Sequence, residues 1–352
     1  MMLLAFFAGL LLLILGAEGL VRGASRLATR VGMSPLIIGL TVVAFGTSSP
    51  ELAVSLKAAL DDQAGIAMGN VVGSNIFNVL FILGVSGLIV PLVVAQQLIR
   101  FDIPLMVGLS LAVLLLAMDG GVSRLDGVLL VAGLGAYLVF LFRQNAKAPS
   151  MEAAPDGESA PSSLGINLLY VGVGLAMLVL GSRWLVGGAV SFAQSLGISE
   201  QVIGLTIIAA GTSLPEVVTS IIAALRGERD IAVGNVVGSN VFNLLGVLGL
   251  TGLLAPSGIA VSDALLGFDI PVMIVVALAC LPICFTGGVI NRWEGGVLLA
   301  YYLAYTLYLI LAATDHDALP VFSATLLYFA LPLTAMTLAV LAVQERRRRA
   351  EG

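Results

Sequence analysis

The chain has 352 residues, of which 59% are hydrophobic and only 11% are charged. An ordinary soluble domain carries roughly 25% charged residues, so this composition excludes a soluble globular enzyme. So few charged side chains cannot cover a surface in water, and most residues must therefore face lipid or one another. The net charge of −5 indicates no particular partner.

Several other function classes are disfavoured. Nucleic-acid binding needs a clustered basic surface, and the only dense basic cluster is Arg346 to Arg349. Cys280 and Cys284 lie four apart in an apolar run, which predicts packing and not a disulfide or zinc site. His316 is expected in a solvated loop. No nucleophile with a base, phosphate loop or pair of metal-binding histidines is evident, so we expect neither enzymatic activity nor a resident cofactor.

Eleven apolar runs approach the length that crosses a bilayer, about 17 to 25 residues. They lie at 2–22, 35–59, 64–90, 102–118, 125–142, 164–187, 200–225, 230–254, 268–286, 295–313 and 319–343. The first run has no basic residues before it and leads on into more helix, so we expect a retained helix and not a signal peptide. The chain is therefore predicted to be an all-α polytopic membrane protein.

The basic residues predict the orientation, because short cytoplasmic loops retain positive charge. One set of alternate loops holds 13 of them: Arg22, Arg26, Arg30, Arg100, Arg143, Lys147, Arg226, Arg229, Arg292 and Arg346 to Arg349. The other set holds 3, which are Lys57, Arg124 and Arg183. We expect a multi-pass protein of the cell (inner) membrane with its N-terminus outside and its C-terminus in the cytoplasm.

The two halves of the membrane part are copies. Residues 39–84 read GLTVVAFGTSSPELAVSLKAALDDQAGIAMGNVVGSNIFNVLFILG, and residues 204–249 read GLTIIAAGTSLPEVVTSIIAALRGERDIAVGNVVGSNVFNLLGVLG, an offset of 165 with no gap. Identical residues occupy 27 of these 46 positions. One copy holds five spans, an odd number, so the second copy enters the membrane with opposite polarity. Such inverted repeats are typical of secondary transporters with a site near the midplane, where the repeats meet.

These observations divide the chain into four parts. The first five-helix repeat occupies residues 1–143, and the second, inverted repeat occupies residues 164–313. Residues 144–163 have the Pro, Ala, Ser, Asp and Glu content of a linker and are expected in the cytoplasm. Residues 314–352 are expected to form one additional transmembrane helix and a basic cytoplasmic tail.

Each copy has a carboxylate within a hydrophobic span, in AFGTSSPE at 44–51 and AAGTSLPE at 209–216. Pro50 and Pro215 are expected to free carbonyls near the glycine four residues earlier, and unwound carbonyls at membrane depth line cavities or bind ions. A carboxylate near the bilayer centre costs about 3 kcal/mol. No basic residue lies near mid-span, so Glu51 and Glu216 are expected to bind a cation or a proton. The alternative is a pair of permanently protonated glutamates.

A second motif follows in each copy, GNVVGSNIFN at 69–78 and GNVVGSNVFN at 234–243. Ser74 with Asn78, and Ser239 with Asn243, are four apart and share one helix face. The glycines favour close helix packing, whereas the Ser and Asn side chains favour ligation. Carboxylates, hydroxyls, amide oxygens and main-chain carbonyls together suit a hard cation such as Ca²⁺.

Four further charged residues are interpreted structurally. Asp102 and Asp269 each precede Ile-Pro at the start of a span, which predicts a helix N-cap. Glu18 and Arg183 occupy equivalent positions in the two copies. The inverted topology places Glu18 near the cytoplasmic face and Arg183 near the outer face, so we expect them to be interfacial and not to pair.

With these motifs the chain resembles the cation/Ca²⁺ exchanger superfamily, and within it the prokaryotic sodium/calcium exchanger-like antiporters. The resemblance lies in GTSSPE at 46–51 with GSNIFN at 73–78, and in GTSLPE at 211–216 with GSNVFN at 238–243. It covers ten of the eleven expected helices and implies a ten-helix core with the eleventh helix outside it.

The resemblance also implies the ligands. Glu51 and Glu216 would be carboxylate ligands shared by Ca²⁺ and Na⁺, and Asn78 would lie beside the central position. The remaining implied ligands are the side chains of Thr47, Thr212, Ser48, Ser213, Ser74 and Ser239 and the carbonyls of Ala44 and Ala209. Asn243 departs from the family pattern, because several members carry Asp there.

The leading function hypothesis is antiport, in which Na⁺ and Ca²⁺ compete for one pair of carboxylates and the site opens to each side in turn. Proton/Ca²⁺ exchange and K⁺-dependent Na⁺/Ca²⁺ exchange are the alternatives. A cation channel is disfavoured, because inverted repeats around a buried site indicate alternating access and not a continuous pore. The expected partners are the transported ions and membrane lipid.

Overall fold

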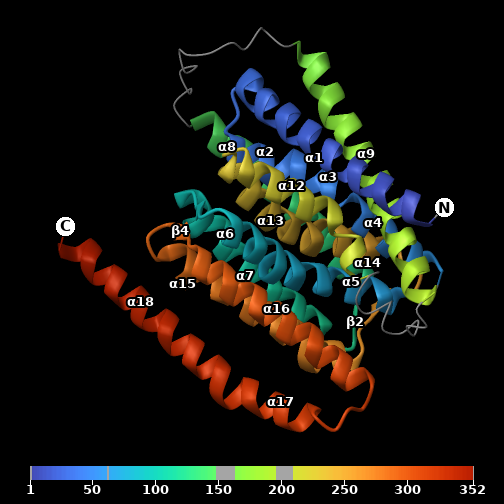
Figure 1. Ribbon diagram of the computed structural model, residues 1–352, viewed down its shortest axis with the longest axis vertical. Coiled ribbons are helices and arrows are strands. Elements are labelled where there is room, and N and C mark those ends of the chain that lie inside the picture. The colour runs from blue at the N-terminus through green and yellow to red at the C-terminus, as the bar shows by residue number, and fades with distance from the viewer. Residues whose placement is uncertain (1, 62, 148–162, 196–208, 352) are drawn as a thin grey trace.

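The computed structural model describes residues 2–61, 63–147, 163–195 and 209–351, which form a bundle of helices (Figure 1). In these residues, nine helices are long and apolar enough to cross a membrane. Pro35–Thr47 and Ser49–Leu60, which meet at an angle of 43°, complete up to ten spans. The expected span at 200–225 is described only from Ala209 onward.

The first repeat begins with the long helix α1 and contains a broken second span. Its elements are α1 (Met2–Val31), α2 (Pro35–Ile38), η1 (Gly39–Val43), α3 (Ala44–Thr47), α4 (Ser49–Leu60), α5 (Ala64–Phe77), η2 (Asn78–Leu83), α6 (Gly84–Ile89), β1 (Leu92–Val93), η3 (Leu98–Asp102), α7 (Ile103–Ala117), β2 (Gly121–Val122) and α8 (Arg124–Lys147). The elements labelled η are π-helical turns that continue the neighbouring α-helices.

The second repeat follows the same order. Its elements are α9 (Leu164–Ser195), α11 (Ala209–Gly211), α12 (Leu214–Leu225), α13 (Arg229–Phe242), η5 (Asn243–Val247), α14 (Leu248–Leu254), β3 (Ile259–Ala260), η6 (Leu265–Asp269), α15 (Ile270–Phe285), β4 (Val289–Ile290) and α16 (Arg292–Ala313). The additional C-terminal span consists of α17 (Leu319–Thr325), η7 (Leu326–Ala330) and α18 (Leu331–Glu351), which lies along the outside of the bundle (Figure 1).

The linker expected at 144–163 falls mainly on residues 148–162, which lie outside the described part of the chain. Its first four residues differ from the expectation, because α8 continues to Lys147. The side chain of Asn145 accepts a hydrogen bond from the amide of Ser34 and donates one to the carbonyl of Gly32. These bonds fasten the end of α8 to the turn after α1 and account for the extra helix.

The centre of the bundle is formed by the helices that carry the GSNxFN motifs. The span Arg229–Leu254 is fully buried over its apolar window and Gly65–Ile89 is 72% buried, whereas the window of Leu319–Glu345 has no buried residues. Cys280 and Cys284 are free and buried, as their position in an apolar run predicts. The structure therefore places the polar motifs at the greatest depth and the additional span at the periphery.

Helices α1 and α9 pack side by side through glycines (Figure 1). A Cβ atom on Gly9 would lie 2.7 Å from the carbonyl oxygen of Gly181, and one on Gly16 would lie 2.8 Å from that of Gly174. Gly9 and Gly16 correspond to Gly174 and Gly181 at the repeat offset of 165. Small residues at these positions let two backbones meet without side chains between them.

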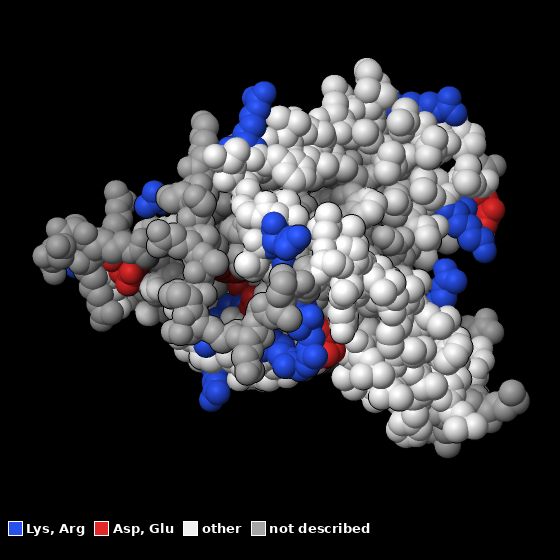
Figure 2. All heavy atoms as spheres, turned by 90° about the horizontal axis from the view of Figure 1, so that it is seen from above, with Lys and Arg blue, Asp and Glu red and all other residues white. Residues whose placement is uncertain are grey.

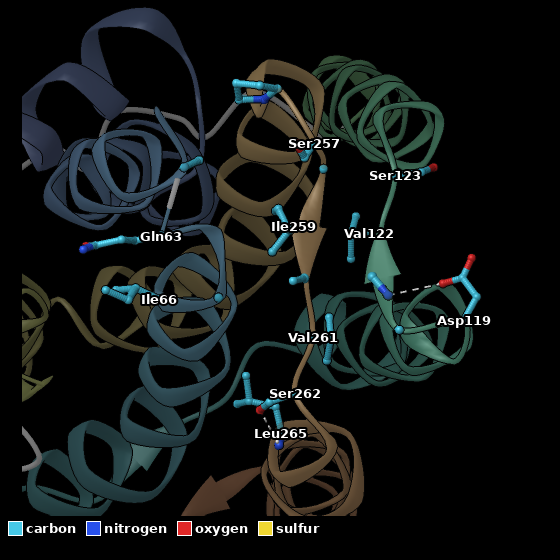
Figure 3. A pocket seen from close by; sticks show the side chains of 17 residues that line it. Gln63, Ile66, Asp119, Val122, Ser123, Ser257, Ile259, Val261, Ser262 and Leu265 are labelled. Carbon is cyan, nitrogen blue, oxygen red and sulfur yellow. Dashed lines mark hydrogen bonds between the residues drawn. The ribbon is translucent and has the colours of Figure 1, made fainter. Parts of the chain in front are cut away.

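Two short antiparallel sheets connect the repeats. β1 pairs with β4, with Leu92 opposite Ile290, and β2 pairs with β3, with Val122 opposite Ile259 (Figure 3). Each sheet thus takes one strand from each repeat, and the two sheets are related by the repeat. They join the loops of the two halves at both ends of the bundle.

The predicted N-caps at Asp102 and Asp269 are wrong. Both residues have helical backbone angles, because the π-helical turns η3 and η6 come directly before α7 and α15. Neither side chain caps its helix. Instead, the hydroxyl of Tyr137 donates to Asp102 over 2.9 Å, and that of Tyr305 donates to Asp269 over 2.6 Å. The same motif therefore ties α7 to α8 and α15 to α16.

Charged side chains are sparse on the surface. Seen from above the view of Figure 1, they form small separate groups, and most of the visible surface is uncharged (Figure 2). Large apolar side chains are exposed on the outer helices, including Leu4, Leu115, Leu169 and Tyr328. Such a surface suits lipid, because water does not solvate it.

We expect Gly174→Ala to destabilise the protein by about 1–3 kcal/mol, because the added methyl group would overlap the backbone of α1. Its Cβ atom would lie 2.7 Å from the carbonyl oxygen of Gly16. Gly172→Ala is the matched control, since nothing lies within 4 Å of its Cβ position. Thermal unfolding in detergent measures the difference. Equal melting temperatures for the two variants would contradict the close contact of α1 with α9.

Candidate functional site

The helices that carry the glutamates are broken one turn before them. α3 ends at Thr47 and α4 begins at Ser49, and Ser48 between them has φ −79° and ψ 5°. Ser213 has φ −89° and ψ 8° between α11 and α12. Pro50 and Pro215 lie in the first turn of α4 and α12, where the missing amide is tolerated. The predicted breaks at the prolines are therefore present in both repeats.

Each repeat contributes a hydroxyl to the glutamate of the other. Ser48 Oγ donates to Glu216 Oε1 over 3.0 Å, and Ser213 Oγ donates to Glu51 Oε1 over 2.7 Å. Both carboxylates are buried, with 1% of each residue exposed. The two halves of the chain thus meet at Glu51 and Glu216.

The asparagines of the second motifs also meet across the repeats. Asn78 Nδ2 donates to Asn240 Oδ1 over 2.9 Å. Asn243 Nδ2 donates to Ser74 Oγ over 3.1 Å and to Asn75 Oδ1 over 3.2 Å. All five residues are buried. Because the amide N–H groups are used in these bonds, the carbonyl oxygens of Asn78 and Asn243 remain free to face another group.

The threonine and alanine positions are less symmetric. Thr47 Oγ1 lies 3.1 Å from both Asn235 Oδ1 and the Val43 carbonyl oxygen, and its one proton can be donated to either. Thr212, its counterpart, is partly buried, and its hydroxyl has no hydrogen-bond partner among the described residues. The Ala44 carbonyl accepts a bond from the amide of Ser48. Ala209 begins α11, and residues 201–208 before it lie outside the described part of the chain.

Sequence reasoning missed a set of asparagines that hold the site together. Asn70 donates to the main-chain carbonyl of Glu51 over 3.2 Å, and Asn235 donates to that of Glu216 over 3.4 Å. Asn240 accepts the bond from Asn78. A signal was present in the sequence, because Asn70 with Asn235, like Asn75 with Asn240, recur at the offset of 165.

Several buried oxygens of the predicted site residues have no hydrogen-bond partner in the part of the chain that the structure describes. These are Glu51 Oε2, Glu216 Oε2, Asn78 Oδ1, Asn243 Oδ1, Ser239 Oγ and Thr212 Oγ1. A buried polar atom without a partner costs about 1–3 kcal/mol, so each of these oxygens calls for an additional group. Since the atoms are all oxygens and two belong to carboxylates, their chemistry fits a hard cation.

Among the described residues, no ion pair joins a positive side chain to Glu51 or Glu216. Glu18, in contrast, pairs with Arg22 and Arg226. The same part of the chain contains no group of three or more His, Cys, Asp or Glu that could hold a metal ion. A site with only two carboxylates suits an ion that must also leave.

A sizeable cavity lies away from the candidate site. A cavity of about 1010 Å³ opens beside the β2–β3 sheet and is lined by Gln63, Ile66, Asp119, Ser123 and Ser262, among others (Figure 3). None of the predicted ligands lines it. The cavity lies at one end of the bundle, and neither glutamate is among its lining residues. It is therefore separate from the candidate site.

Comparison with known proteins shows which family the chain resembles. The model of the family described as "Sodium/calcium exchanger protein" matches residues 1–143 and 166–311. The putative antiporter CaxA of Alkalimonas amylolytica is 40% identical over 304 residues, covering 84% of this chain and 95% of CaxA. The sodium/calcium exchanger MaX1 of Methanosarcina acetivorans is 35% identical over 342 residues, covering 86% of this chain and 96% of MaX1.

A solved structure has the same architecture. The sodium-calcium exchanger NCX_Mj, soaked with Na⁺ and Sr²⁺, superposes with a TM-score of 0.74 at 31% identity, covering 89% of this chain and 97% of NCX_Mj. The resemblance drawn from the motifs and the predicted all-α exchanger fold are thereby confirmed. The relatives are exchangers and antiporters, which supports a transporter and not an enzyme.

We expect Ser48→Ala to lower stability by about 1–3 kcal/mol, because Glu216 Oε1 loses its hydrogen-bond donor while remaining buried. Ser49→Ala is the matched control, since the neighbouring hydroxyl bonds only to the Phe45 carbonyl of its own helix. Thermal unfolding in detergent without added divalent cation is the measurement. If both variants melt together, the bond between the repeats does not contribute to the folded state.

Proposed function

The chain belongs to the sodium/calcium exchanger family, and we propose that it exchanges Na⁺ for Ca²⁺ by alternating access at a midplane site built on Glu51 and Glu216. One observation carries the proposal: among the described residues both buried carboxylates keep an oxygen without a partner, and so do Asn78 and Asn243, the second of which is linked through Ser74 and Asn70 to the main chain of Glu51. The ligands would be the twelve residues predicted from the sequence.

Charge explains how two kinds of ion can share this site. Two ionised glutamates provide two negative charges, which balance one Ca²⁺ where water is scarce. Na⁺ ions also accept carboxylate, hydroxyl and amide oxygens, so they compete for the same ligands. Occupation by either ion removes the electrostatic penalty of the buried carboxylates. The occupied protein can then change its opening from one side of the membrane to the other.

The placement in the membrane is part of the proposal. The chain is a multi-pass membrane protein, and we place it in the cell membrane with its N-terminus outside and its C-terminus in the cytoplasm. The excess of Lys and Arg in one set of loops supports this orientation. The division into repeats at 1–143 and 164–313, a cytoplasmic linker at 144–163 and an additional helix with a basic tail at 314–352 belongs to the same proposal.

We expect Ca²⁺ uptake into proteoliposomes to be driven by an outward Na⁺ gradient and not by K⁺ or H⁺ gradients of equal size. Each gradient is imposed separately on the same preparation, with protein-free liposomes as the control. Uptake driven by H⁺ alone would replace the proposal with proton/Ca²⁺ exchange. A requirement for K⁺ together with Na⁺ would identify K⁺-dependent exchange.

Glu51→Gln and Glu216→Gln are each expected to abolish Ca²⁺ transport, because each removes half of the charge that balances the divalent ion. Glu294→Gln is the matched control. Glu294 is equally buried, but it forms the capping box of α16 with Asn291, a role that glutamine also fills. Ca²⁺ flux near the parent level in either of the first two variants would refute the site assignment.

Asn243→Asp is expected to retain Ca²⁺ transport and to make its rate depend more steeply on pH between about 6 and 8. A third carboxylate beside two others repels them, so protons compete with cations for the added group. Na⁺-driven Ca²⁺ uptake against pH, measured for both proteins in the same liposomes, tests this. Superimposable profiles would show that residue 243 does not share the electrostatics of the ion site.

A further inference from the structure

Charged side chains hold α1 against the second repeat at the side that we propose to be cytoplasmic. Arg226 Nε, directly after α12, donates to Glu18 over 3.0 Å, and its Nη2 makes a second contact with this carboxylate. Arg22 Nε lies 2.5 Å from Glu18 one turn along α1. Ser25 donates to Glu228 over 2.6 Å. We call Glu18 and Arg226 the inner pair; α1 also packs against α12.

The repeat contains the same arrangement at the opposite side with the charges exchanged. At the offset of 165, Glu18 corresponds to Arg183 on α9, and Arg226 corresponds to Asp61 at the end of α4. We call Arg183 and Asp61 the outer pair. Within the described residues, no ion pair joins these two side chains. Both repeats therefore place opposite charges at equivalent positions, but only one pair is in contact.

The helices at the outer pair stand apart. α9 has little contact with α4, whereas the equivalent helices α1 and α12 pack closely. A cavity of about 390 Å³ lies between α9 and the broken second span, and Gly46, Ser49, Leu175 and Arg183 are among its lining residues. α1 thus packs against α12 at the inner pair, whereas a cavity lies between α9 and the second span beside Arg183.

The packing of α1 on α9 couples the two ends. Their backbones meet at Gly9 with Gly181 and at Gly16 with Gly174, so the helices cannot separate or slide freely. A movement that brings α9 onto α4 must therefore also displace α1 from α12. In an inverted repeat, the two halves exchange conformations when the site opens to the opposite side of the membrane. Each half then adopts the conformation that the other half had before.

We propose that the two pairs alternate: Glu18 bonds to Arg226 when the inner side is closed, and Arg183 bonds to Asp61 when the outer side is closed. The inference rests on the proposed alternating access and adds the residues that bias it. Half of the Arg226 side chain is exposed, at 49%, and Glu18 is 21% exposed. Exposed pairs stabilise weakly, so either pair can bias the equilibrium and still break in each cycle.

Labelling of Ser49→Cys tests the inner pair. Ser49 lines the cavity beside Arg183, so its accessibility reports whether the outer side is open when the inner pair is formed or lost. A membrane-impermeant thiol reagent is applied to intact cells, and labelling reports the outward-open state. We expect Glu18→Gln to slow labelling about 2- to 5-fold, as a weak exposed pair is lost. Adding Asp61→Asn should return the rate toward the parent value. Arg30→Gln, at the same end of α1, is the charge control and should leave the rate unchanged.

Cross-linking tests the outer pair directly. Asp61→Cys and Arg183→Cys are combined in a chain that carries Cys280→Ser and Cys284→Ser, and a short bifunctional maleimide is added. We expect Glu18→Gln to raise the cross-linking rate about 2- to 5-fold. An unchanged rate, or no cross-link in any variant, would overturn the inference. So would a labelling rate at Ser49→Cys that does not respond to Glu18→Gln.

Transport measurements keep this inference distinct from the proposed function. If Ca²⁺ flux is driven by Na⁺ but labelling and cross-linking do not respond to Glu18→Gln, the ion pairs have no role and the exchange activity stands. If labelling and cross-linking shift as expected but flux does not depend on Na⁺, the pairs alternate in a transporter of another ion couple.

Discussion

Two buried carboxylates without a positive partner are the constraint on which the rest of the structure depends. Glu51 and Glu216 are each 1% exposed, and each receives one hydroxyl from the opposite repeat. Their second oxygens have no hydrogen-bond partner among the described residues. Burying two ionised carboxylates without an opposite charge is costly, and the proposed cation would supply that charge. The free-energy cost of the uncompensated carboxylates in the empty protein thus contributes to the affinity of the proposed site for its ions.

Both halves of the inverted repeat contribute polar groups to the two buried carboxylates. Because each glutamate bonds to a serine at the break of the other helix, neither half can complete its polar groups alone. Asn78 with Asn240, and Asn243 with Ser74, repeat the same exchange between the halves. The polar network therefore joins the repeats at the bundle centre, while apolar packing joins α1 to α9 at the periphery. A site held by both halves changes when either half moves.

Much of the fold could be predicted because its determinants are local. Apolar run length indicates the spans, and the offset of 165 indicates their symmetry. Pro50 and Pro215 indicate the breaks before the glutamates. The predictions fail where contacts between residues far apart in the sequence determine the local structure. Asp102 lies inside a helix because the preceding turn is already helical, and its partner Tyr137 is on another span. Asn70 and Asn235 were missed because their bonds to the glutamate carbonyls depend on helix packing.

The two repeats carry the same residue types near the bundle centre, whereas equivalent positions at their ends carry charges of opposite sign. Different physical demands on the two regions explain this difference. In the proposed site the central residues would face the same ion from two sides, so both copies need oxygens. The ends face each other in pairs, and a pair needs only opposite charges, in either order. Glu18 with Arg226 and Arg183 with Asp61 satisfy this with reversed signs. On the proposed orientation Arg183 also lies on the side that holds few basic residues, and Asp61 would give that charge a specific partner when the outer side closes.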